Sequence, residues 1–273
     1  MTDQKIFSII MATFNCGDKV EKTLRSILSQ NEKLFELIVV DGASSDDTVD
    51  LISKYKENLT LVSERDNGIY DAFNKGIDLS TGKYLYFIGA GDCLRPGILD
   101  QVKDLLPAGP PTLVYGKCFF VKKKYFDGRQ FKTSDFTWTN ICHQGEFYHR
   151  SIFEMVGKYD EGYKVFADWM LNLKCFLNEE VNELYIPLYI ADYEEGGISS
   201  EIDNDPAFKK EFPQFVKRKL GIRAFIKCKF KMMKPNSAYF TGGVGYPLFC
   251  EILGQIVPFF RPCCRYVRNR FRK

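Results

Sequence analysis

The stretch that decides the fold reads Ser8-Ile9-Ile10-Met11-Ala12-Thr13-Phe14-Asn15. Residues 6–11 form a short apolar run that ends in polar residues, which predicts a buried strand. Residues 37–40 are a second apolar run, and they end at Asp41-Gly42. Between the two runs, apolar side chains recur at helical spacing, so the sequence predicts a strand, a helix and a strand in succession.

The same alternation continues as far as residue 106. Strands are predicted at residues 59–63 and 84–88, and helices at 49–55, 70–77 and 96–106. Such alternation implies parallel strands joined by right-handed crossovers, and ligands of such sheets lie beyond the carboxyl ends of the strands. The polar residues that follow the strands at these ends are Thr13, Asn15, Asp41, Asp66 and Asp92.

The pattern changes after Pro110-Pro111. Residues 112–121 and 125–132 predict paired strands that turn at Asp127-Gly128. Helices are expected at 151–156, closed by Gly157, and at 166–177, with a further strand at 184–193. The chain is therefore expected to form an α/β fold, a Rossmann-like mixed sheet flanked by helices.

The net charge of this 273-residue chain is only +3, but it is unevenly distributed. Residues 207–273 carry 16 Lys and Arg against 2 Glu, whereas residues 1–206 carry 22 Lys and Arg against 33 Asp and Glu. A basic tail of this kind is typical of a segment that binds nucleic acid or an anionic membrane.

The tail predicts one or two helices at 208–234, then an apolar stretch at 244–260 that is short for a membrane span and is followed by cations. We interpret it as an amphipathic segment suited to an anionic membrane surface. No nucleic-acid-binding module is visible. The alternative is a solvated face that packs on the main domain.

The nine cysteines show no CxxC spacing and there are only two histidines, so a zinc site is disfavoured. The polar N-terminus leads straight into a strand and shows no secretory signal. Reduced thiols in the cytoplasm are therefore expected.

The first group of polar residues is Val40-Asp41-Gly42-Ala43-Ser44-Ser45-Asp46-Asp47-Thr48. An aspartate directly after a buried strand offers a carboxylate that accepts hydrogen bonds from a base or a ribose. Capping of the next helix is the alternative, and it is the preferred interpretation for Asp46 and Asp47.

The second group runs from Glu64-Arg65-Asp66-Asn67-Gly68 to Asn74-Lys75-Gly76. Lys75 is expected to meet a phosphate and Arg65 to lie over a base, with a solvated loop of local salt bridges as the alternative. The third group, Gly89-Ala90-Gly91-Asp92, combines glycines that let a diphosphate approach with a carboxylate that suits magnesium or manganese. A plain turn aspartate is the alternative for Asp92.

These groups, in this order, resemble the GT-A nucleotide-diphospho-sugar transferases, in particular the family 2 glycosyltransferases. The resemblance covers residues 7–97 and returns at 143–173. It implies a metal-dependent enzyme that uses a nucleotide-sugar donor. It implies that Thr13 and Asp41 hold the nucleotide base. The position of Asn15 and Asp66 after strands, and the charges of Arg65 and Lys75, add these four residues to the predicted nucleotide-binding set.

The resemblance also implies that Asp92 binds a divalent metal ion, Mn²⁺ or Mg²⁺, on the diphosphate. The family motif often has two aspartates around one residue, and here the first of these positions is Ala90. A metal held mainly by phosphates and water, with one carboxylate, remains compatible with this pattern.

A fourth group, at residues 141–148, is followed by Phe166-Ala167-Asp168-Trp169-Met170. In the family an acidic residue at the start of this later helix acts as general base, and Asp168 fits that place. An acceptor hydroxyl needs such a base to take its proton, and direct displacement inverts the anomeric carbon. His143 and Gln144 are expected to contact the acceptor or a phosphate. A helix N-cap is the alternative role for Asp168.

The resemblance thus implies an inverting transfer of a single sugar, with UDP favoured as its carrier. The acceptor expected is a glycan or a lipid-linked sugar of bacterial surface polysaccharide such as O-antigen, at the inner face of the cytoplasmic membrane. The domains expected are a GT-A domain at 1–200, with a nucleotide-binding half at 1–110 and an acceptor half at 111–200, and a basic region at 201–273.

Two alternatives stay open. A sugar nucleotidyltransferase normally has a Gly-rich, basic phosphate loop after its first strand, where this chain has Ala12-Thr13-Phe14-Asn15-Cys16-Gly17. A non-catalytic, transferase-like binding protein is favoured by Ala90 and opposed by the presence of both Asp92 and Asp168.

Overall fold

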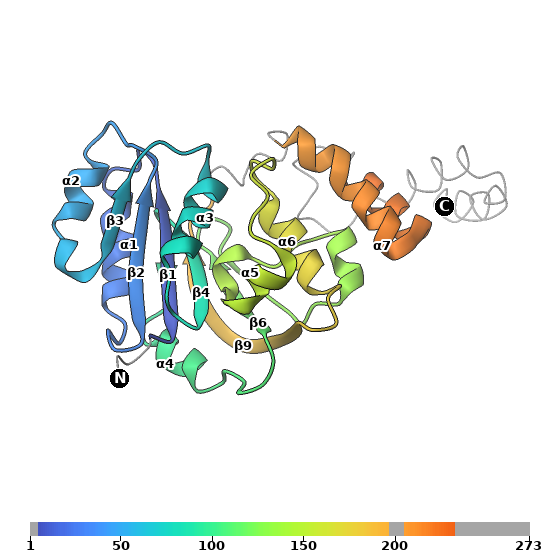
Figure 1. Cartoon of the computed structure of the whole chain (residues 1–273), viewed down its shortest axis with the longest axis horizontal. Coiled ribbons are helices and arrows are strands. Elements are labelled where there is room, and N and C mark those ends of the chain that lie inside the picture. The colour runs from blue at the N-terminus through green and yellow to red at the C-terminus, as the bar shows by residue number, and fades with distance from the viewer. Residues whose placement is uncertain (1–4, 197–204, 233–273) are drawn as a thin grey trace, which may run out of the picture. The chain divides into compact units, whose positions relative to one another are not determined.

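The first half of the chain alternates strands and helices as the sequence predicts (Figure 1). The structure is a computed structural model that describes residues 5–196 and 205–232. Strands β1 to β4 are parallel and lie in the order β3-β2-β1-β4. The elements of this half are β1 (Phe7–Thr13), α1 (Lys19–Leu28), β2 (Phe35–Asp41), α2 (Thr48–Ser53), η1 (Lys56–Asn58), β3 (Thr60–Ser63), α3 (Ile69–Leu79) and β4 (Tyr84–Gly89).

The second half extends the same sheet with antiparallel pairs. Strand β8 is antiparallel to β4, β6 is antiparallel to β8, and β9 is parallel to β6. The result is the expected mixed sheet. The elements of this half are β5 (Cys93–Leu94), α4 (Ile98–Lys103), β6 (Thr112–Phe120), β7 (Tyr125–Asp127), η2 (Thr133–Thr137), η3 (His143–Gly145), β8 (Glu146–His149), α5 (Ser151–Val156), α6 (Ala167–Cys175) and β9 (Asn182–Tyr193).

The hairpin of β6 and β7 differs from the prediction. It turns at residues 121–124, where Lys124 has a φ of 54°, and not at Asp127-Gly128. Gly128 instead follows β7 and allows a close approach, because a Cβ there would lie 2.6 Å from Lys117 Cα. Strands β5 and β8 were not predicted, since neither is an apolar run or lies next to a readable turn: β5 is Cys93-Leu94 and β8 is Glu146-Phe147-Tyr148-His149.

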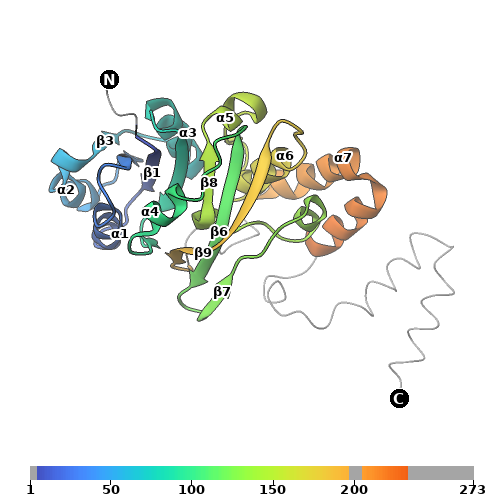
Figure 2. The ribbon, with the colours of Figure 1, turned by 90° about the horizontal axis from the view of Figure 1, so that it is seen from below.

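Alternate residues of β1 face two different layers of helices. Phe7, Ile9 and Met11 belong to one core cluster with α1, α2 and α4. Ile10 faces α3, where Gly76 lies so close that a Cβ on it would be 2.3 Å from Ile10 Cγ2. Figure 2 shows α1 and α4 on one side of the sheet and α3 and α5 on the other. The strands are thus covered on both faces, which explains their continuous apolar runs.

The start of helix α7 (Pro206–Met232) belongs to the first compact unit of the chain, which ends at Phe212; the second unit begins at Pro213. Phe208 and Phe212 are buried, with ring centroids 5.7 and 5.5 Å from that of Trp169. This contact places the end of the first unit later than the expected residue 200.

Helix α7 matches the helix predicted at 208–234, and Gly221, with a φ of 86°, interrupts it. The predicted apolar stretch at 244–260 and the cations after it lie outside the described residues. Within residues 5–196 and 205–232, every helix is too short or too polar to cross a membrane.

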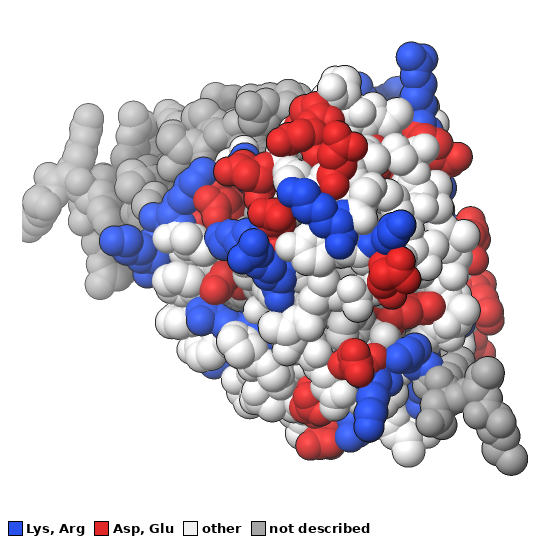
Figure 3. Space-filling model, turned by 90° about the vertical axis from the view of Figure 1, so that its left-hand side faces the viewer, with Lys and Arg blue, Asp and Glu red and all other residues white. Residues whose placement is uncertain are grey.

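On the side where Figure 1 shows α2 and β3, acidic and basic side chains are interspersed around an uncharged area (Figure 3). The acidic excess of residues 1–206 therefore forms no patch of one sign on that face.

Candidate active site

Three neighbouring parallel strands end side by side in polar residues, at Thr13, Asp41 and Ser63. Asp41 is fully buried, and its carboxylate accepts hydrogen bonds from the Thr13 hydroxyl at 3.0 Å and the Ser63 hydroxyl at 2.8 Å. Ser44 donates twice more, from its hydroxyl at 2.6 Å and its backbone N–H at 2.9 Å. Four donors fill the capacity of one carboxylate, so a nucleotide would reach Asp41 by exchange with one of these hydroxyls.

The loop after β1 is tied to the loop after β2 through Asn15. The Asn15 N–H donates to Ser44 Oγ at 2.8 Å, and Asn15 Oδ1 accepts from the Ser45 N–H at 2.8 Å. Asp46 accepts from the Thr48 N–H at 3.1 Å, which is the capping role expected of it. Asp47, at the N-cap itself, makes no capping hydrogen bond. Asn15, which is exposed, thus ties together the two loops of the predicted nucleotide shelf.

Asp66 joins Asp41 at the strand ends because Gly42 leaves room for it. A Cβ at Gly42 would lie 2.7 Å from Asp66 Oδ2. Asp66 Oδ1 accepts from the Gly68 N–H at 3.0 Å. Burial raises the pKa of Asp66, and the charge of Asp41 acts in the same direction.

Lys75 is held by groups of its own loop. Its Nζ lies 2.9 Å from Glu64 Oε1 and 3.7 Å from Asp71 Oδ1, and it donates to the Arg65 carbonyl at 3.0 Å. The hydrogen bond to Glu64 raises the pKa of Lys75. The local salt bridges weighed as the alternative are therefore present, and a phosphate would have to compete with them. The Arg65 side chain is exposed, and no ion pair holds it among the described residues.

Asp92 is the buried carboxylate after β4, with 5% of its surface exposed. Its Oδ1 accepts from the Glu194 N–H at 2.8 Å and its Oδ2 from Gln144 Nε2 at 2.8 Å. Burial raises the pKa of Asp92 to about 7, against these hydrogen bonds, which favour the charged form. Gln144 thus lies at the predicted phosphate side.

Asp168 lies in the first turn of α6, where Phe166 and not Asp168 is the N-cap. Its Oδ2 accepts from Asn140 Nδ2 at 2.8 Å, and its Oδ1 lies 3.0 Å from the Tyr70 hydroxyl. The Tyr70 hydroxyl also lies 2.6 Å from the Val165 carbonyl oxygen. Burial raises the pKa of Asp168 to about 6. A carboxyl group with such a pKa is suited to taking and releasing a proton near neutral pH.

His143 lies in an aromatic cluster and not among charged groups. Its ring centroid is 5.4 Å from that of Phe73 and 5.9 Å from that of Phe87. Burial lowers the pKa of His143 to about 4. A neutral imidazole in this place offers no cation to a phosphate.

One short segment contacts both predicted reaction carboxylates. Asn140 donates its amide to Asp168, and four residues later Gln144 donates its amide to Asp92. Asp92 and Asp168 are therefore held by two ends of residues 140–144, although they are far apart in the sequence.

Several residues that shape this site had no predicted role. Ser44 and Ser63 surround Asp41, and their position at strand ends was a usable signal. Tyr70 and Asn140 contact Asp168, and Asn172 contacts Asn140; of the three, only Tyr70 lies between the ends of the second polar group.

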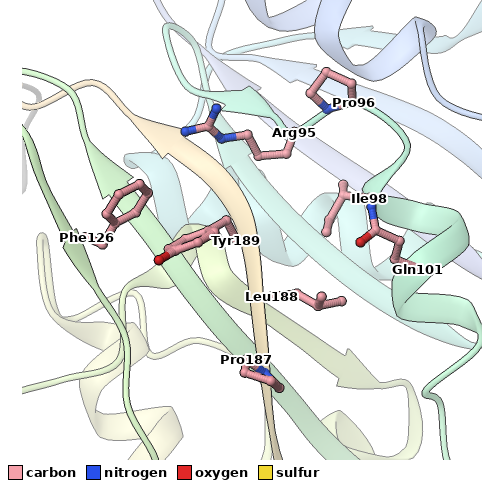
Figure 4. Close-up of a pocket in the computed structure, with 8 residues that line it drawn as sticks. All are labelled: Arg95, Pro96, Ile98, Gln101, Phe126, Pro187, Leu188 and Tyr189. Atoms are coloured by element: carbon pink, nitrogen blue, oxygen red, sulfur yellow. The ribbon is translucent and has the colours of Figure 1, made fainter.

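A cavity of about 400 Å³ lies elsewhere, beside β9 and the start of α4 (Figure 4). None of the ten predicted site residues lines it. Its lining residues are Arg95, Pro96, Ile98, Gln101, Phe126, Pro187, Leu188 and Tyr189.

The parallel strand order and its antiparallel extension form the expected GT-A fold, with carboxylates at the strand ends. Comparison with known proteins gives the family: the glycosyl transferase family 2 model matches residues 8–166, and the chain belongs to that family. It is thus an enzyme that transfers glycosyl groups.

Relatives agree with this assignment. A Mycobacterium tuberculosis protein described as a PGL/p-HBAD biosynthesis glycosyltransferase is 38% identical over 229 residues, which are 81% of this chain and 88% of the relative. Staphylococcus aureus TarS 1-349, solved in complex with UDP-GlcNAc, is similar in fold with a TM-score of 0.63 and 17% identity, over 91% of this chain and 80% of TarS 1-349. The mannosyltransferase PcManGT from Pyrobaculum calidifontis, in complex with GDP-Man and Mn²⁺, has a TM-score of 0.61 and 16% identity, over 97% of this chain and 84% of its own.

Proposed function

We propose that this glycosyltransferase moves one sugar from a nucleotide-diphospho-sugar, with UDP as the favoured carrier, to a hydroxyl group of the acceptor, with inversion at the anomeric carbon. The observation that carries the proposal is the pair of amides on one segment: Asn140 on Asp168 and Gln144 on Asp92. A base for the acceptor and a carboxylate for the diphosphate are thereby held by the same short piece of chain. The TarS complex with UDP-GlcNAc supports the nature of the donor.

Asp168 is the proposed general base. The ionised carboxylate takes the proton of the acceptor hydroxyl as its oxygen attacks the anomeric carbon and the nucleoside diphosphate leaves. The Tyr70 hydroxyl has one hydrogen for two acceptors, Asp168 Oδ1 and the Val165 carbonyl. Once Asp168 is protonated, it can donate to Tyr70 while Tyr70 donates to Val165, so the new proton has a partner in place.

The nucleotide is proposed to lie over Thr13, Asp41 and Asp66. Asp41 and Asp66 stand together at Gly42, at the carboxyl ends of β2 and β3. Arg65 directly precedes Asp66 in the sequence, and its exposed side chain is available to a base or ribose. Ligands of parallel sheets occupy this edge. Asn15 holds the loops after β1 and β2 through its Oδ1, whereas Lys75 would meet a phosphate only by exchanging its present ion pairs.

The donor set around Asp92 is compatible with one divalent ion held by a single carboxylate. Among the described residues no three His, Cys, Asp or Glu side chains converge on one point. Asp92 nevertheless keeps lone pairs beyond its two hydrogen bonds, and Mg²⁺ or Mn²⁺ accepts one carboxylate together with phosphate and water. Asp92 would hold such an ion, and the ion would supply positive charge against the leaving diphosphate.

The acceptor is proposed to be a lipid-linked glycan or a glycolipid at an anionic membrane surface on the cytoplasmic side. The mycobacterial relative is described as acting in PGL/p-HBAD biosynthesis. The charge of residues 207–273, 16 Lys and Arg against 2 Glu, favours anionic lipid. Sedimentation of the full chain with phosphatidylglycerol vesicles, but not with phosphatidylcholine vesicles, is the expected result; equal binding to both would contradict a charge-based attachment.

The experiment for the proposed reaction starts with thermal shift against a panel of nucleotide sugars with Mn²⁺. The donor that stabilises the chain is then incubated with candidate acceptors, and the anomeric configuration of the product is read by proton NMR. An inverted product is expected. A retained configuration would contradict direct displacement with Asp168 as base.

A further inference from the structure

A second buried carboxyl group, Glu146 at the start of β8, lies behind Asp168 in the same hydrogen-bond network. Glu146 is fully buried, and none of the site assignments above gives it a role. Its Oε1 lies 2.5 Å from Asn172 Nδ2, and its Oε2 lies 2.9 Å from the Tyr148 hydroxyl. Asn172 Nδ2 also donates to Asn140 Oδ1 at 3.0 Å, and Asn140 donates to Asp168. A continuous chain of hydrogen bonds thus runs from Glu146 to Asp168.

The donor and the acceptor of each hydrogen bond between Asp168 and Glu146 follow from the negative charge of Asp168. An ionised carboxylate only accepts, so Asn140 turns its NH₂ group to Asp168 and its Oδ1 to Asn172. Asn172 then uses both of its N–H groups, one on Asn140 and one on Glu146 Oε1. Its own Oδ1 is left facing the Tyr148 hydroxyl at 2.7 Å and needs a donor there.

The Tyr148 hydroxyl has one hydrogen, and two neighbouring oxygens, Asn172 Oδ1 and Glu146 Oε2, can accept it. If that hydrogen goes to Asn172 Oδ1, the Tyr148 oxygen can only accept from Glu146, and Glu146 can donate only when protonated. If Glu146 were ionised, the single Tyr148 hydrogen could go to Glu146 Oε2 or to Asn172 Oδ1, and the other buried oxygen would lose that donor, which is costly. With a proton on Glu146, every hydrogen-bond donor and acceptor of this network has a partner.

We propose that Glu146 is held as a neutral acid and acts as a positioning residue, which fixes the base Asp168 through Tyr148, Asn172 and Asn140. The two carboxyl groups of the network then have opposite states, one protonated and structural, the other ionised and reactive. This inference rests on the proposed role of Asp168 as base.

The surroundings of Glu146 support its neutral state. Burial raises its pKa well above the ordinary value, and the charge of Asp168 adds to this effect. His143 Nδ1 lies 3.6 Å from Glu146 Oε2, but burial lowers the pKa of His143 to about 4, so it is no cation near neutral pH. The titratable groups around Glu146 are Tyr115, Cys142, His143, Tyr159, Asp168 and Cys175, and none of these is positively charged at that pH.

The test compares Glu146→Gln with Glu146→Ala. Glutamine copies a neutral acid, since its NH₂ can donate to Tyr148 and its oxygen can accept from Asn172. We expect Glu146→Gln to keep kcat/KM within about threefold and to keep the acid limb of the pH profile in place. Glu146→Ala should lower kcat at least about tenfold with the donor KM unchanged. Loss of about 100-fold in Glu146→Gln, or a shifted acid limb, would overturn the proposal.

Infrared difference spectroscopy of wild type against Glu146→Gln gives a readout that needs no turnover. The carbonyl stretch of a protonated carboxyl group should persist up to pH 8 in the wild type and be missing in Glu146→Gln. A carboxylate band in its place would overturn the neutral state of Glu146 even if Glu146→Ala fails to fold. Because this measurement is independent of activity, its outcome is separate from whether Asp168 is the base.

Discussion

Replacing the proposed base by its neutral isostere should stabilise the fold, and the gain should develop as pH rises from about 4 to about 6. Burial raises the pKa of Asp168 from its ordinary value of 3.8 to about 6 in the folded chain. The folded state therefore binds this proton more tightly than the unfolded state, and the resulting stability is present at low pH and lost as pH rises through 6. Each unit of pKa difference corresponds to about 1.4 kcal/mol, so the ionised carboxylate costs up to about 3 kcal/mol at pH 8.

The asparagine side chain introduced by Asp168→Asn avoids this cost and fits the same contacts. Its oxygen can accept from Asn140, and its NH₂ can donate to Tyr70, which donates to Val165. Urea unfolding at pH 8 should show Asp168→Asn to be more stable than wild type by about 1–3 kcal/mol, and at pH 4 the two should be equal. The control is Asp50→Asn, an exposed position on α2. A variant that is less stable at pH 8, or a difference that does not depend on pH, would refute the reasoning.

Three further predictions follow from single contacts. Asp41→Ala leaves the buried Thr13 hydroxyl and three less buried donors of Ser44 and Ser63 without their acceptor and should cost about 1–3 kcal/mol in urea unfolding. It should also weaken nucleotide binding in calorimetry, and an unchanged affinity would contradict the base-binding role of Asp41. Gly76→Ala places a Cβ 2.3 Å from Ile10 Cγ2 and should lower the free energy of unfolding by about 1–3 kcal/mol. Gly109→Ala, the control, meets open space and should leave it unchanged. Equal stabilities of the two variants would argue against the close packing of α3 on β1. Since the pKa of Asp92 is about 7, the affinity for Mn²⁺ in the presence of donor should fall as pH drops below 7 in titration calorimetry, and an affinity that does not change between pH 8 and 6 would exclude Asp92 as ligand.

The strands and the carboxylates at their ends could be predicted because both depend on local sequence. Asp41 is the last residue of β2 and Asp92 comes three residues after the end of β4, and parallel strands bring such positions to one edge of the sheet. The family resemblance supplied the place of Asp168, which no period or spacing could have given.

The side-chain contacts around the site carboxylates could not be predicted from local sequence. Gln144 lies 52 residues from Asp92, and Tyr70 lies 98 residues from Asp168. These pairs meet only because β8, a strand of four residues without a readable period, joins the two halves of the sheet beside β4. His143 was expected beside charged ligands, but the aromatic rings of α3 and β4 that surround it lie far from it in sequence.

The most direct test of the account is the turnover of Asp168→Asn, measured beside its affinity for the donor. Calorimetry should give a donor Kd close to that of the wild type, since Asp168 is assigned to the acceptor and not to the nucleotide. The rate of sugar transfer should fall by about 10²–10⁴-fold, the usual contribution of a general base. Transfer at a rate within about tenfold of wild type would contradict the assignment of Asp168 and, with it, the proposed chemistry of the site.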